Sequence, residues 1–442
     1  MAEVIGKIYY KLDLFAKDFL LRATLFVGSV RLTAWVLGLV AAEVNSAGKF
    51  TVLCLGRSIF LDDVKALASF SGRLKYLVIH RRYWKTIFYH CLDNDEKNLI
   101  EEVNYHRPDF CEAGKKKYFD YLGKLLPVLK TKLGFAAVLS GNFGYLEQQE
   151  LAAVCEVERI PFIVLHKEGL AVATSMDSFA FLAQNYRFRG AKLLVYNEKI
   201  KQALLTSGLL GLSKEKVEVV GVPRLDSYFL VPPAKLARRQ VVFFSFYPSD
   251  KFFFLFSQEL GSDSAKLKKA AVLTEDFHYW LMEFASRHPD ITVVIKTKAA
   301  LYYLDYVKEI YKRRFSASKP LPNLIMTNAG DPVSLIRNSF AVLGFSSTTL
   351  IEAVIAGKII ISPDFGDFFA SQRTWDYFVG YPELIAYVRS KAELDDRLLQ
   401  AQSSRPSSAE TRLEFLKDLI YLPDGRASQR AEEAIIKVIK QK

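Results

Sequence analysis

The stretch that decides the fold runs from Leu343 to Pro363 and reads LGFSSTTLIEAVIAGKIIISP. An apolar run ends at a glycine, four hydroxyl side chains follow, and the helix-forming sequence LIEAVIAG comes next. Gly357 closes this predicted helix, and a second apolar run begins at Ile359. The order strand, turn, helix and strand is typical of a domain in which helices cover a parallel sheet.

The hydroxyl-rich turn also predicts a site for an anion. Helix N-termini carry unpaired N–H groups and a partial positive charge, which suit a phosphate. Ser346, Ser347, Thr348 and Thr349 can cap the helix and donate hydrogen bonds to such a group. Glu352 falls one turn into the helix, where its carboxylate can accept hydrogen bonds from ribose hydroxyls. The alternative is an ordinary capped helix without a ligand.

Length and composition limit the classes of protein that fit this chain. The 442 residues suffice for two to three domains, and the 50% of apolar residues exclude global disorder. The net charge of +12 favours anionic partners, but no nucleic-acid-binding motif is present, so we expect no nucleic acid. The four cysteines lack CxxC spacing and the six histidines lack paired ligand spacing. We therefore expect a reduced, cytoplasmic protein without a metal site or cofactor.

The first 48 residues form a separate segment. Residues 23–42 read ATLFVGSVRLTAWVLGLVAA, which is nearly long enough to span a bilayer. Arg31 lies at the centre of this run, where a charge costs about 2.5–3.5 kcal/mol on insertion scales. Upstream, residues 7–22 mix lysines with aromatic residues and leucines, as in helices that lie in the membrane interface. We expect residues 1–48 to associate with the anionic inner face of the cell membrane; helices packed on the protein's own core are the alternative.

From Lys49 onward, short apolar runs alternate with helical stretches, which indicates a parallel sheet with helical crossovers. The first series of predicted strands covers 50–56, 75–80, 136–141, 161–166, 192–197 and 217–221. Three prolines and a basic cluster then interrupt the rhythm between Val222 and Arg239. The second series covers 240–246, 291–298, 323–328, 341–345 and 358–362.

These two series predict an α/β protein with two Rossmann-like domains facing a cleft. The domains would be residues 49–225 and 240–402, joined by a linker at 226–239 and followed by C-terminal helices at 403–442. In such sheets ligands bind beyond the carboxyl ends of the strands. Polar residues at those ends are therefore the candidates for chemistry.

In the first domain, His166 and Glu168 directly follow the strand at 161–166. Either residue is placed to act as a general base on an acceptor hydroxyl, and a structural histidine is the alternative. Arg224 follows the strand at 217–221 and offers a guanidinium to phosphate, or else to a salt bridge with Asp226 or Glu168.

In the second domain, Lys296 and Lys298 end the strand at 291–298. They would bring positive charge to the hydroxyl-rich turn if their strand neighbours the strand at 341–345. The alternative is a pair of solvated lysines.

Four segments carry a resemblance to a known group of enzymes: HKEG at 166–169, VVGVPRLD at 219–226, GFSSTTLIEAVIAGKIII at 344–361 and LPDGRASQR at 422–430. Their order and spacing resemble GT-B-type transferases of bacterial surface polysaccharide synthesis. That group includes the capsule Kdo transferases and the CDP-glycerol glycerophosphotransferases. HKEG has two residues between the histidine and the glycine, and KTK stands where the group has Lys-His-Pro. These departures favour a sugar nucleotide as donor over CDP-glycerol.

The resemblance implies a metal-independent GT-B glycosyltransferase that acts in capsule or lipopolysaccharide synthesis on a lipid-linked or glycan acceptor. Its nucleotide-sugar donor would bind the second domain at the hydroxyl-rich turn and Glu352, and its acceptor would lie near His166 and Glu168. A CDP-polyol phosphotransferase of the same fold is the first alternative. A sugar-nucleotide epimerase and a non-catalytic scaffold docked on a membrane are the others.

Overall fold

The computed structural model describes residues 2–57, 60–101, 104–107, 109–167, 170, 186–230, 239–246, 264–315, 320–345, 347–364, 376–403 and 406–441. These residues form two compact units. Unit 1 contains the described residues up to 170, those of 186–227 and those of 418–441. Unit 2 contains the described residues between 228 and 417.

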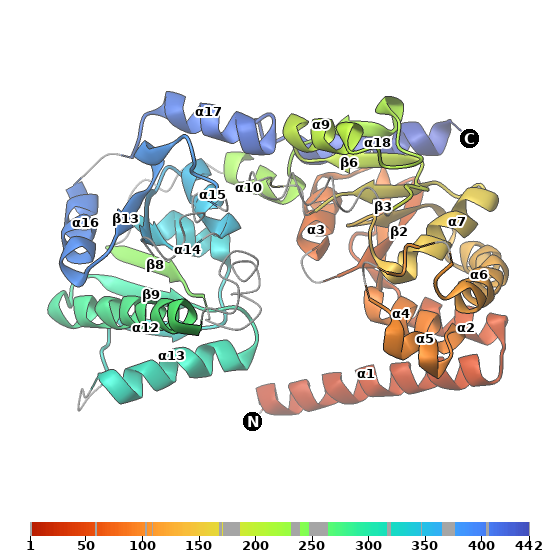
Figure 1. Ribbon diagram of the computed structural model, residues 1–442, viewed down its shortest axis with the longest axis horizontal. Coiled ribbons are helices and arrows are strands. Elements are labelled where there is room, and N and C mark those ends of the chain that lie inside the picture. Colours follow the sequence, from red (N-terminus) through yellow and green to blue (C-terminus); the bar gives the residue numbers. More distant parts are fainter. Residues whose placement is uncertain are drawn as a thin grey trace. The chain divides into compact units, whose positions relative to one another are not determined.

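The sheet of unit 1 has seven strands in the order β1-β3-β2-β4-β5-β6-β7. Figure 1 labels β2, β3 and β6 of this sheet. The strands are β1 (Ala42–Glu43), β2 (Phe50–Gly56), β3 (Leu74–His80), β4 (Phe135–Ser140), β5 (Phe162–Leu165), β6 (Lys192–Val195) and β7 (Val217–Val219). The pair β1–β3 is antiparallel, and the other pairs are parallel. The six predicted strands of this half are therefore confirmed, within one to two residues at their ends.

Helices cover both faces of this sheet, which is why its strands are almost continuously apolar. They are α3 (Phe60–Phe70), α4 (Arg81–Cys91), α5 (Asn94–Leu99), α6 (Glu112–Leu133), α7 (Gln149–Val157), α9 (Glu198–Thr206) and α18 (Ala427–Lys440). Leu53 and Leu55 of β2 join a core cluster with α4, α6, α7 and α9. The intervening Val52 and Cys54 are equally buried, and α3 packs on β2 and β3 and against α18.

The N-terminal segment forms two helices, α1 (Ala2–Phe26) and α2 (Val30–Val40). Leu21 and Leu25 of α1, together with Ala34, Val36 and Leu37 of α2, belong to the core cluster of unit 1. The Thr33 hydroxyl lies 2.7 Å from the Tyr121 hydroxyl of α6, which ties α2 to the domain. These residues thus pack on the protein's own core, which is the alternative to membrane association that the sequence left open. Within the part of the chain that is described, no helix combines the length and apolarity needed to cross a membrane.

The sheet of unit 2 has six parallel strands in the order β10-β9-β8-β11-β12-β13. The strands are β8 (Gln240–Phe244), β9 (Thr292–Lys296), β10 (Leu324–Thr327), β11 (Ala341–Leu343), β12 (Ile359–Pro363) and β13 (Ala386–Val388). The helices are α12 (Ser264–Arg287), α13 (Leu301–Arg314), α14 (Pro332–Asn338), α15 (Thr348–Ile355) and α16 (Lys391–Ser403). The five predicted strands are confirmed, and β13 is an addition.

The chain passes from unit 2 back to unit 1 within α17 (Ala409–Ile420), so the following helix α18 belongs to unit 1. The carboxylate of Asp226, the first residue of α10 (Asp226–Leu230), accepts hydrogen bonds from the N–H groups of Ala427 and Ser428 at 3.0 and 2.7 Å. Asp226 therefore caps a helix that begins two hundred residues later in the chain. Arg430 donates from Nε to the carbonyl oxygen of Val220 at 2.9 Å. The segments at 219–226 and 422–430 thus fold against each other, which gives both a structural role.

Candidate functional site

The strand order defines where a ligand can bind in unit 2. From β8 the chain first adds β9 and β10 on one side and then β11, β12 and β13 on the other. The order reverses between β8 and β11, and a doubly wound sheet opens a crevice beyond the carboxyl ends of the two strands at such a reversal. Ser245 follows β8 at this point, and the turn before α15 follows β11. The sequence-predicted anion site therefore lies at the switch point of its sheet.

The start of α15 is built as the sequence predicts. Ser347 is the N-cap: its Oγ accepts a hydrogen bond from the N–H of Thr349 at 3.3 Å and lies 2.8 Å from the Thr349 hydroxyl. Ser347, Thr348 and Thr349 are all half-buried. A Cβ on Gly344 would lie 3.1 Å from Leu350, so the helix packs closely on the end of β11. Ser346 lies outside the described residues.

Glu352 lies on the second turn of α15 and is held by a residue that the sequence analysis did not find. The Tyr228 hydroxyl donates a hydrogen bond to Glu352 Oε2 at 2.7 Å. Burial, together with the Glu352 charge, raises the pKa of Tyr228. Arg337 of α14 donates to the Tyr228 carbonyl oxygen at 3.1 Å and holds its guanidinium 5.7 Å from the ring centre. Tyr228 is therefore a neutral, fixed donor that orients the carboxylate.

The two lysines of β9 do not reach this turn through a neighbouring strand. β8 lies between β9 and β11, so the condition under which the two lysines would bring charge to the turn, that the two strands are neighbours, is not met. Lys296 turns its Nζ onto the carbonyl oxygens of Thr297 and Asn328, at 2.7 and 3.1 Å, and burial lowers its pKa. Lys298 is exposed, with its Nζ 5.6 Å from the centre of the Tyr303 ring. A role for either in donor binding stays a prediction.

A serine–histidine pair stands at the switch point instead. The Ser245 Oγ lies 2.7 Å from Nε2 of His278, and Nδ1 of the same ring lies 2.7 Å from the carbonyl oxygen of Thr274. Because a carbonyl oxygen only accepts, the proton belongs on Nδ1, and Nε2 then accepts the Ser245 proton. Burial lowers the pKa of His278 to about 4, so the ring stays neutral. This arrangement leaves the lone pairs of Ser245 Oγ able to accept a further hydrogen bond directly after β8.

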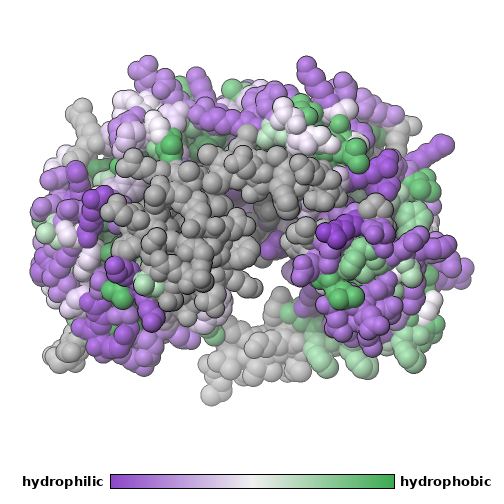
Figure 2. Space-filling view, in the orientation of Figure 1, coloured by the Kyte–Doolittle hydropathy of each residue, from purple (hydrophilic) through white to green (hydrophobic). Residues whose placement is uncertain are grey.

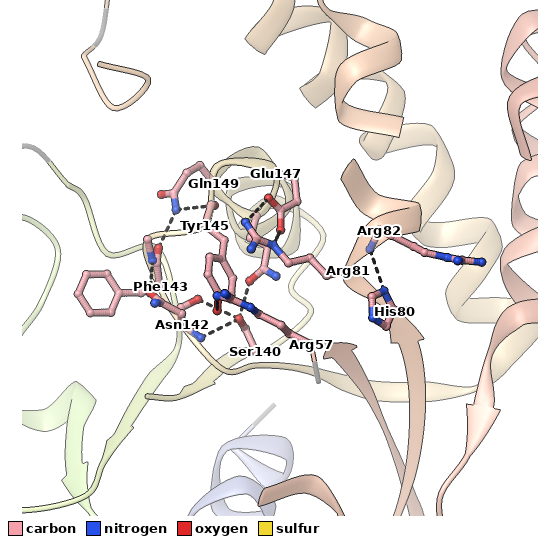
Figure 3. Close-up of polar contacts among 12 residues, drawn as sticks. Arg57, His80, Arg81, Arg82, Ser140, Asn142, Phe143, Tyr145, Glu147 and Gln149 are labelled. Atoms are coloured by element: carbon pink, nitrogen blue, oxygen red, sulfur yellow. Dashed lines mark hydrogen bonds and ion pairs between the residues drawn. The ribbon is translucent and has the colours of Figure 1, made fainter. Parts of the chain in front are cut away.

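The switch point of unit 1 lies between β2 and β4, because β3 is on one side of β2 and β5, β6 and β7 follow on the other. Figure 3 shows the residues that gather at these strand ends. Arg57, directly after β2, donates from Nη1 to the Tyr145 hydroxyl at 2.8 Å. Arg81, directly after β3, places its guanidinium 3.7 Å from the centre of the Tyr145 ring. The two arginines thus hold Tyr145 between them.

The two arginines have different contacts within the cluster. Glu147 is fully buried and accepts hydrogen bonds from both the Nε and the Nη2 of Arg81, the latter at 2.9 Å (Figure 3). Arg57 is half-buried and donates to the Tyr145 hydroxyl. Two guanidinium groups therefore lie at the carboxyl edge of the unit 1 sheet, and groups of this kind suit an anionic group on a substrate.

The turn after β4 borders the same place. Asn142 accepts a hydrogen bond from the N–H of Gly144 at 2.7 Å, and Gln149 donates to the carbonyl oxygen of Phe143 at 2.6 Å (Figure 3). A Cβ on Gly141 would meet the Phe60 ring at 2.7 Å, so this position requires glycine. These contacts fix the backbone of the turn beside the two arginines.

His166 directly follows β5 in this unit and is deeply buried, with 2% of its surface exposed. Its ring centre lies 5.1 Å from that of Phe143, and its backbone N–H donates to the carbonyl oxygen of Leu194 at 2.8 Å. Glu168 lies outside the described residues. A catalytic role for His166 or Glu168 stays a prediction.

Arg224 is engaged within unit 1. Its Nη1 donates to Asp63 Oδ2 at 3.1 Å and to the Tyr196 hydroxyl at 2.8 Å, while that hydroxyl donates to the same carboxylate at 2.7 Å. Asp63 is fully buried, so the charge of Arg224 is needed to offset it. Asp63 is thus a partner of Arg224 that the sequence analysis did not name, and Glu168 lies outside the described residues. Arg224 belongs to unit 1, whereas the other donor-binding candidates belong to unit 2, and its contact with a donor stays a prediction.

The described residues contain no group of three or more histidine, cysteine, aspartate or glutamate side chains that could hold a metal ion. The two parallel sheets, each with its switch point, define a two-domain α/β protein with a GT-B-like fold.

Comparison with solved structures supports this class of fold. The chain is similar to a protein from Listeria monocytogenes assigned as a UDP-N-acetylglucosamine 2-epimerase, with 12% identity over 89% of this chain and 98% of that one and a TM-score of 0.52. It is also similar to another UDP-N-acetylglucosamine 2-epimerase, with 11% identity over 90% and 98% of the two chains and a TM-score of 0.51. A scan of protein-family models and a search of curated proteins found no match.

Proposed function

We propose that this protein is a glycosyltransferase that moves a sugar from a nucleotide-activated donor to a lipid-linked or glycan acceptor in surface polysaccharide synthesis. The observation that carries the proposal is the position of α15. Its capped N-terminus, with Ser347 and Thr349, stands directly beyond β11 at the switch point of the unit 2 sheet. That position and that chemistry fit the phosphates of a nucleotide.

Glu352 and Ser245 extend the donor site. Glu352 lies one turn further along α15 than the phosphate position, and its carboxylate, oriented by Tyr228, accepts hydrogen bonds from the ribose hydroxyls. Ser245 offers oxygen lone pairs at the end of β8, because its proton is donated to His278. As the bond to the sugar breaks, the electron pair leaves with the diphosphate. The N–H groups of α15 then stabilise the developing negative charge.

The acceptor binds at the carboxyl edge of the unit 1 sheet. Arg57 attracts an anionic group on the acceptor, such as the phosphate of a lipid carrier. His166 accepts the proton of the acceptor hydroxyl as its oxygen forms the new bond to the sugar. Glu168 is the second candidate for this step.

The protein lies on the inner face of the cell membrane through α1 and α2. Phe15, Phe19 and Phe26 of α1 are 71%, 62% and 89% exposed. Val27, directly after α1, is 69% exposed, and Trp35 of α2 is 46% exposed. Figure 2 shows apolar side chains gathered over the described part of α1 and over α2. An exposed apolar face of this kind in a monomer is typical of a surface that binds a partner or a lipid interface. This position would bring the enzyme to a lipid-linked acceptor.

The donor site is tested by thermal-shift and calorimetric titration of the full chain with UDP, GDP, CMP and CDP, followed by the matching sugar or glycerol conjugate. We expect one nucleotide to bind and Glu352→Ala to weaken it about tenfold or more, as expected for lost hydrogen bonds to a carboxylate. Glu309→Ala, an exposed glutamate on α13 of the same unit, is the matched control. Binding that is unchanged in Glu352→Ala, or no binding of any nucleotide by folded protein, contradicts the donor site.

An epimerase is the second candidate, because the similar solved structures are named as UDP-N-acetylglucosamine 2-epimerases. The two activities separate in one assay. An epimerase converts the nucleotide sugar to its stereoisomer without an acceptor, whereas a transferase releases the nucleotide and needs an acceptor for full turnover. Stereoisomer formation without acceptor would replace the transferase proposal while keeping the donor site.

A further inference from the structure

A cavity of about 680 Å³ opens at the edge of the unit 1 sheet opposite to Arg57 and Ser140. Its walls are the end of α7, the chain segments that enter β5, β6 and β7, and the last turn of α18 with Gln441 beyond it. These are the amino ends of the strands, so the cavity is separate from both switch points. Its volume falls within the range of about 300–1,000 Å³ that is usual for small-molecule sites.

The charged residues that line the cavity are mainly basic. Five basic side chains face two acidic ones, Glu156 and Glu215, which leaves three positive charges in excess. The basic residues are Arg159, Arg189, Lys192, Lys216 and Lys437. A cavity with this balance attracts a ligand that carries several negative charges.

Three of the five cations are engaged within the protein. Lys192 forms a 2.7 Å ion pair with Glu218, Arg189 lies 3.7 Å from Glu156, and Lys216 donates to the carbonyl oxygen of Gly211 at 3.0 Å.

The other two cations, Arg159 and Lys437, form no side-chain hydrogen bond or ion pair with any described residue. They come from α7 and α18, which are far apart in the sequence, and both line the cavity. They are the cations available to a ligand.

Arg159 occupies a position where the backbone favours glycine. Its φ is +50°, directly after the end of α7, where the Ile160 N–H donates to the carbonyl oxygen of Cys155 at 2.8 Å. This is the C′ position of a helix end, which is usually glycine because a left-handed conformation costs any residue with a Cβ. The chain carries a long cationic side chain at a position where glycine would be more stable.

The remaining lining suits the organic part of a ligand. The apolar part of the lining includes Ala191, which is exposed, and Val438, which is half-buried; Ile160, Pro161 and Phe162 also line the cavity but are buried. An inorganic phosphate would leave most of this space empty, whereas a base or another apolar group would cover it.

We propose that this cavity binds an organic polyphosphate of nucleotide size, held by Arg159 and Lys437, at an effector site separate from the proposed donor site. The competing explanation is that the cations only complement the partial negative charges at the C-terminal ends of α7 and α18. That explanation predicts no ligand, so the two can be distinguished.

The test is hydrogen–deuterium exchange of the full chain with ATP and with tripolyphosphate, two probes of similar charge. We expect ATP to protect residues 155–162 and 435–441, and tripolyphosphate to do so less effectively because it lacks an apolar part. Binding at the donor site would protect 344–356 instead, so the two sites report separately.

Three variants assign the protection to the cavity. Arg159→Gly removes a cation and suits the backbone, and Lys437→Gln removes the second; each should weaken ATP protection about five- to tenfold, as expected for one lost charge-assisted contact. Lys440→Gln, on the same helix but outside the cavity lining, is the matched control and should leave it unchanged. No protection by ATP at millimolar concentration, or equal protection in all three variants, overturns the proposal. Equal protection by ATP and by tripolyphosphate overturns the claim that the ligand has an organic part.

Discussion

Removing one oxygen atom, by Tyr228→Phe, tests whether Glu352 is held in place by the tyrosine hydroxyl. Tyr228 is 7% exposed, and its hydroxyl donates to Glu352 Oε2 at 2.7 Å. Phenylalanine keeps the ring, its burial and its contact with the Arg337 guanidinium, so the change isolates the hydrogen bond.

The magnitude follows from the acceptor and its surroundings. A hydrogen bond to a charged group contributes about 1.5–3 kcal/mol to stability. Glu352 is half-buried, and water can replace part of the lost contact. We therefore expect Tyr228→Phe to lower the free energy of local unfolding around α15 by about 1–2 kcal/mol. Glu352→Gln should cost a similar amount, and the double variant should cost about 1 kcal/mol less than the sum.

Because the chain has two units, global unfolding is not expected to be a single transition. Hydrogen exchange of the α15 amides, compared among the wild type, the two single variants and the double variant, gives the four local free energies directly. Nucleotide affinity, measured on the same four proteins, then shows whether orientation of Glu352 matters to the donor. If the effects of the two single variants on the local unfolding free energy are additive in the double variant, the two side chains are not coupled and the stabilising hydrogen bond is refuted. Unchanged nucleotide affinity in Tyr228→Phe would refute the role of the Tyr228 hydroxyl in orienting the Glu352 carboxylate.

Other predictions concern stability. The pKa of His278 is about 4 in the folded protein and 6.5 in the unfolded chain. The free energy of unfolding is therefore unaffected by this ring above pH 6.5 and falls by about 3 kcal/mol as the pH drops toward 4. Urea titrations across this range should show a smaller decrease in His278→Gln, and an equal decrease would contradict the prediction. Arg81→Met should destabilise unit 1 by about 3–5 kcal/mol because Glu147 is left buried without its partner, and the pair Arg81→Met with Glu147→Leu should restore much of that loss in the same titrations. Gly221 has a φ of +85°, and a Cβ added there would lie 3.1 Å from Ala427 and from Arg430, so Gly221→Ala should lower the free energy of unfolding by about 1–3 kcal/mol. Gly208→Ala is the control, because Gly208 has a similar φ of +75° but nothing within 4 Å of the added Cβ, and it should cost less. Similar melting temperatures for the two variants would show that the contact with α18 is unimportant.

The strands could be predicted because their sequences are continuous apolar runs rich in valine and isoleucine, as strands buried on both faces require. β13 reads AYV and is too short and mixed to stand out. Helix α4 was not predicted, although Tyr83, Trp84, Ile87, Phe88 and Cys91 are buried with helical spacing. That spacing was the available signal; the many aromatic residues, which favour strands, hide it.

The candidate site could be predicted only where it is local in the sequence. The turn at Ser347 and the position of Glu352 follow from one continuous stretch. Tyr228, Ser245 and His278 reach the same sheet from distant parts of the chain, and no local pattern connects them. The order of strands is likewise a property of the whole sheet, which is why the sequence left open whether the strand of Lys296 and Lys298 neighbours the strand before the turn.

The capping of α18 by Asp226 constrains when unit 1 can mature during synthesis. The helix that packs against α3 follows unit 2 in the sequence, so it leaves the ribosome after unit 2 has been synthesised. Unit 2 can therefore complete its core while unit 1 still exposes the surface that α18 will cover. In a nascent chain that lacks α18, the surface of unit 1 around α3 should be accessible to chaperones and proteases. Only a chain that has been synthesised through α18 can cover that surface.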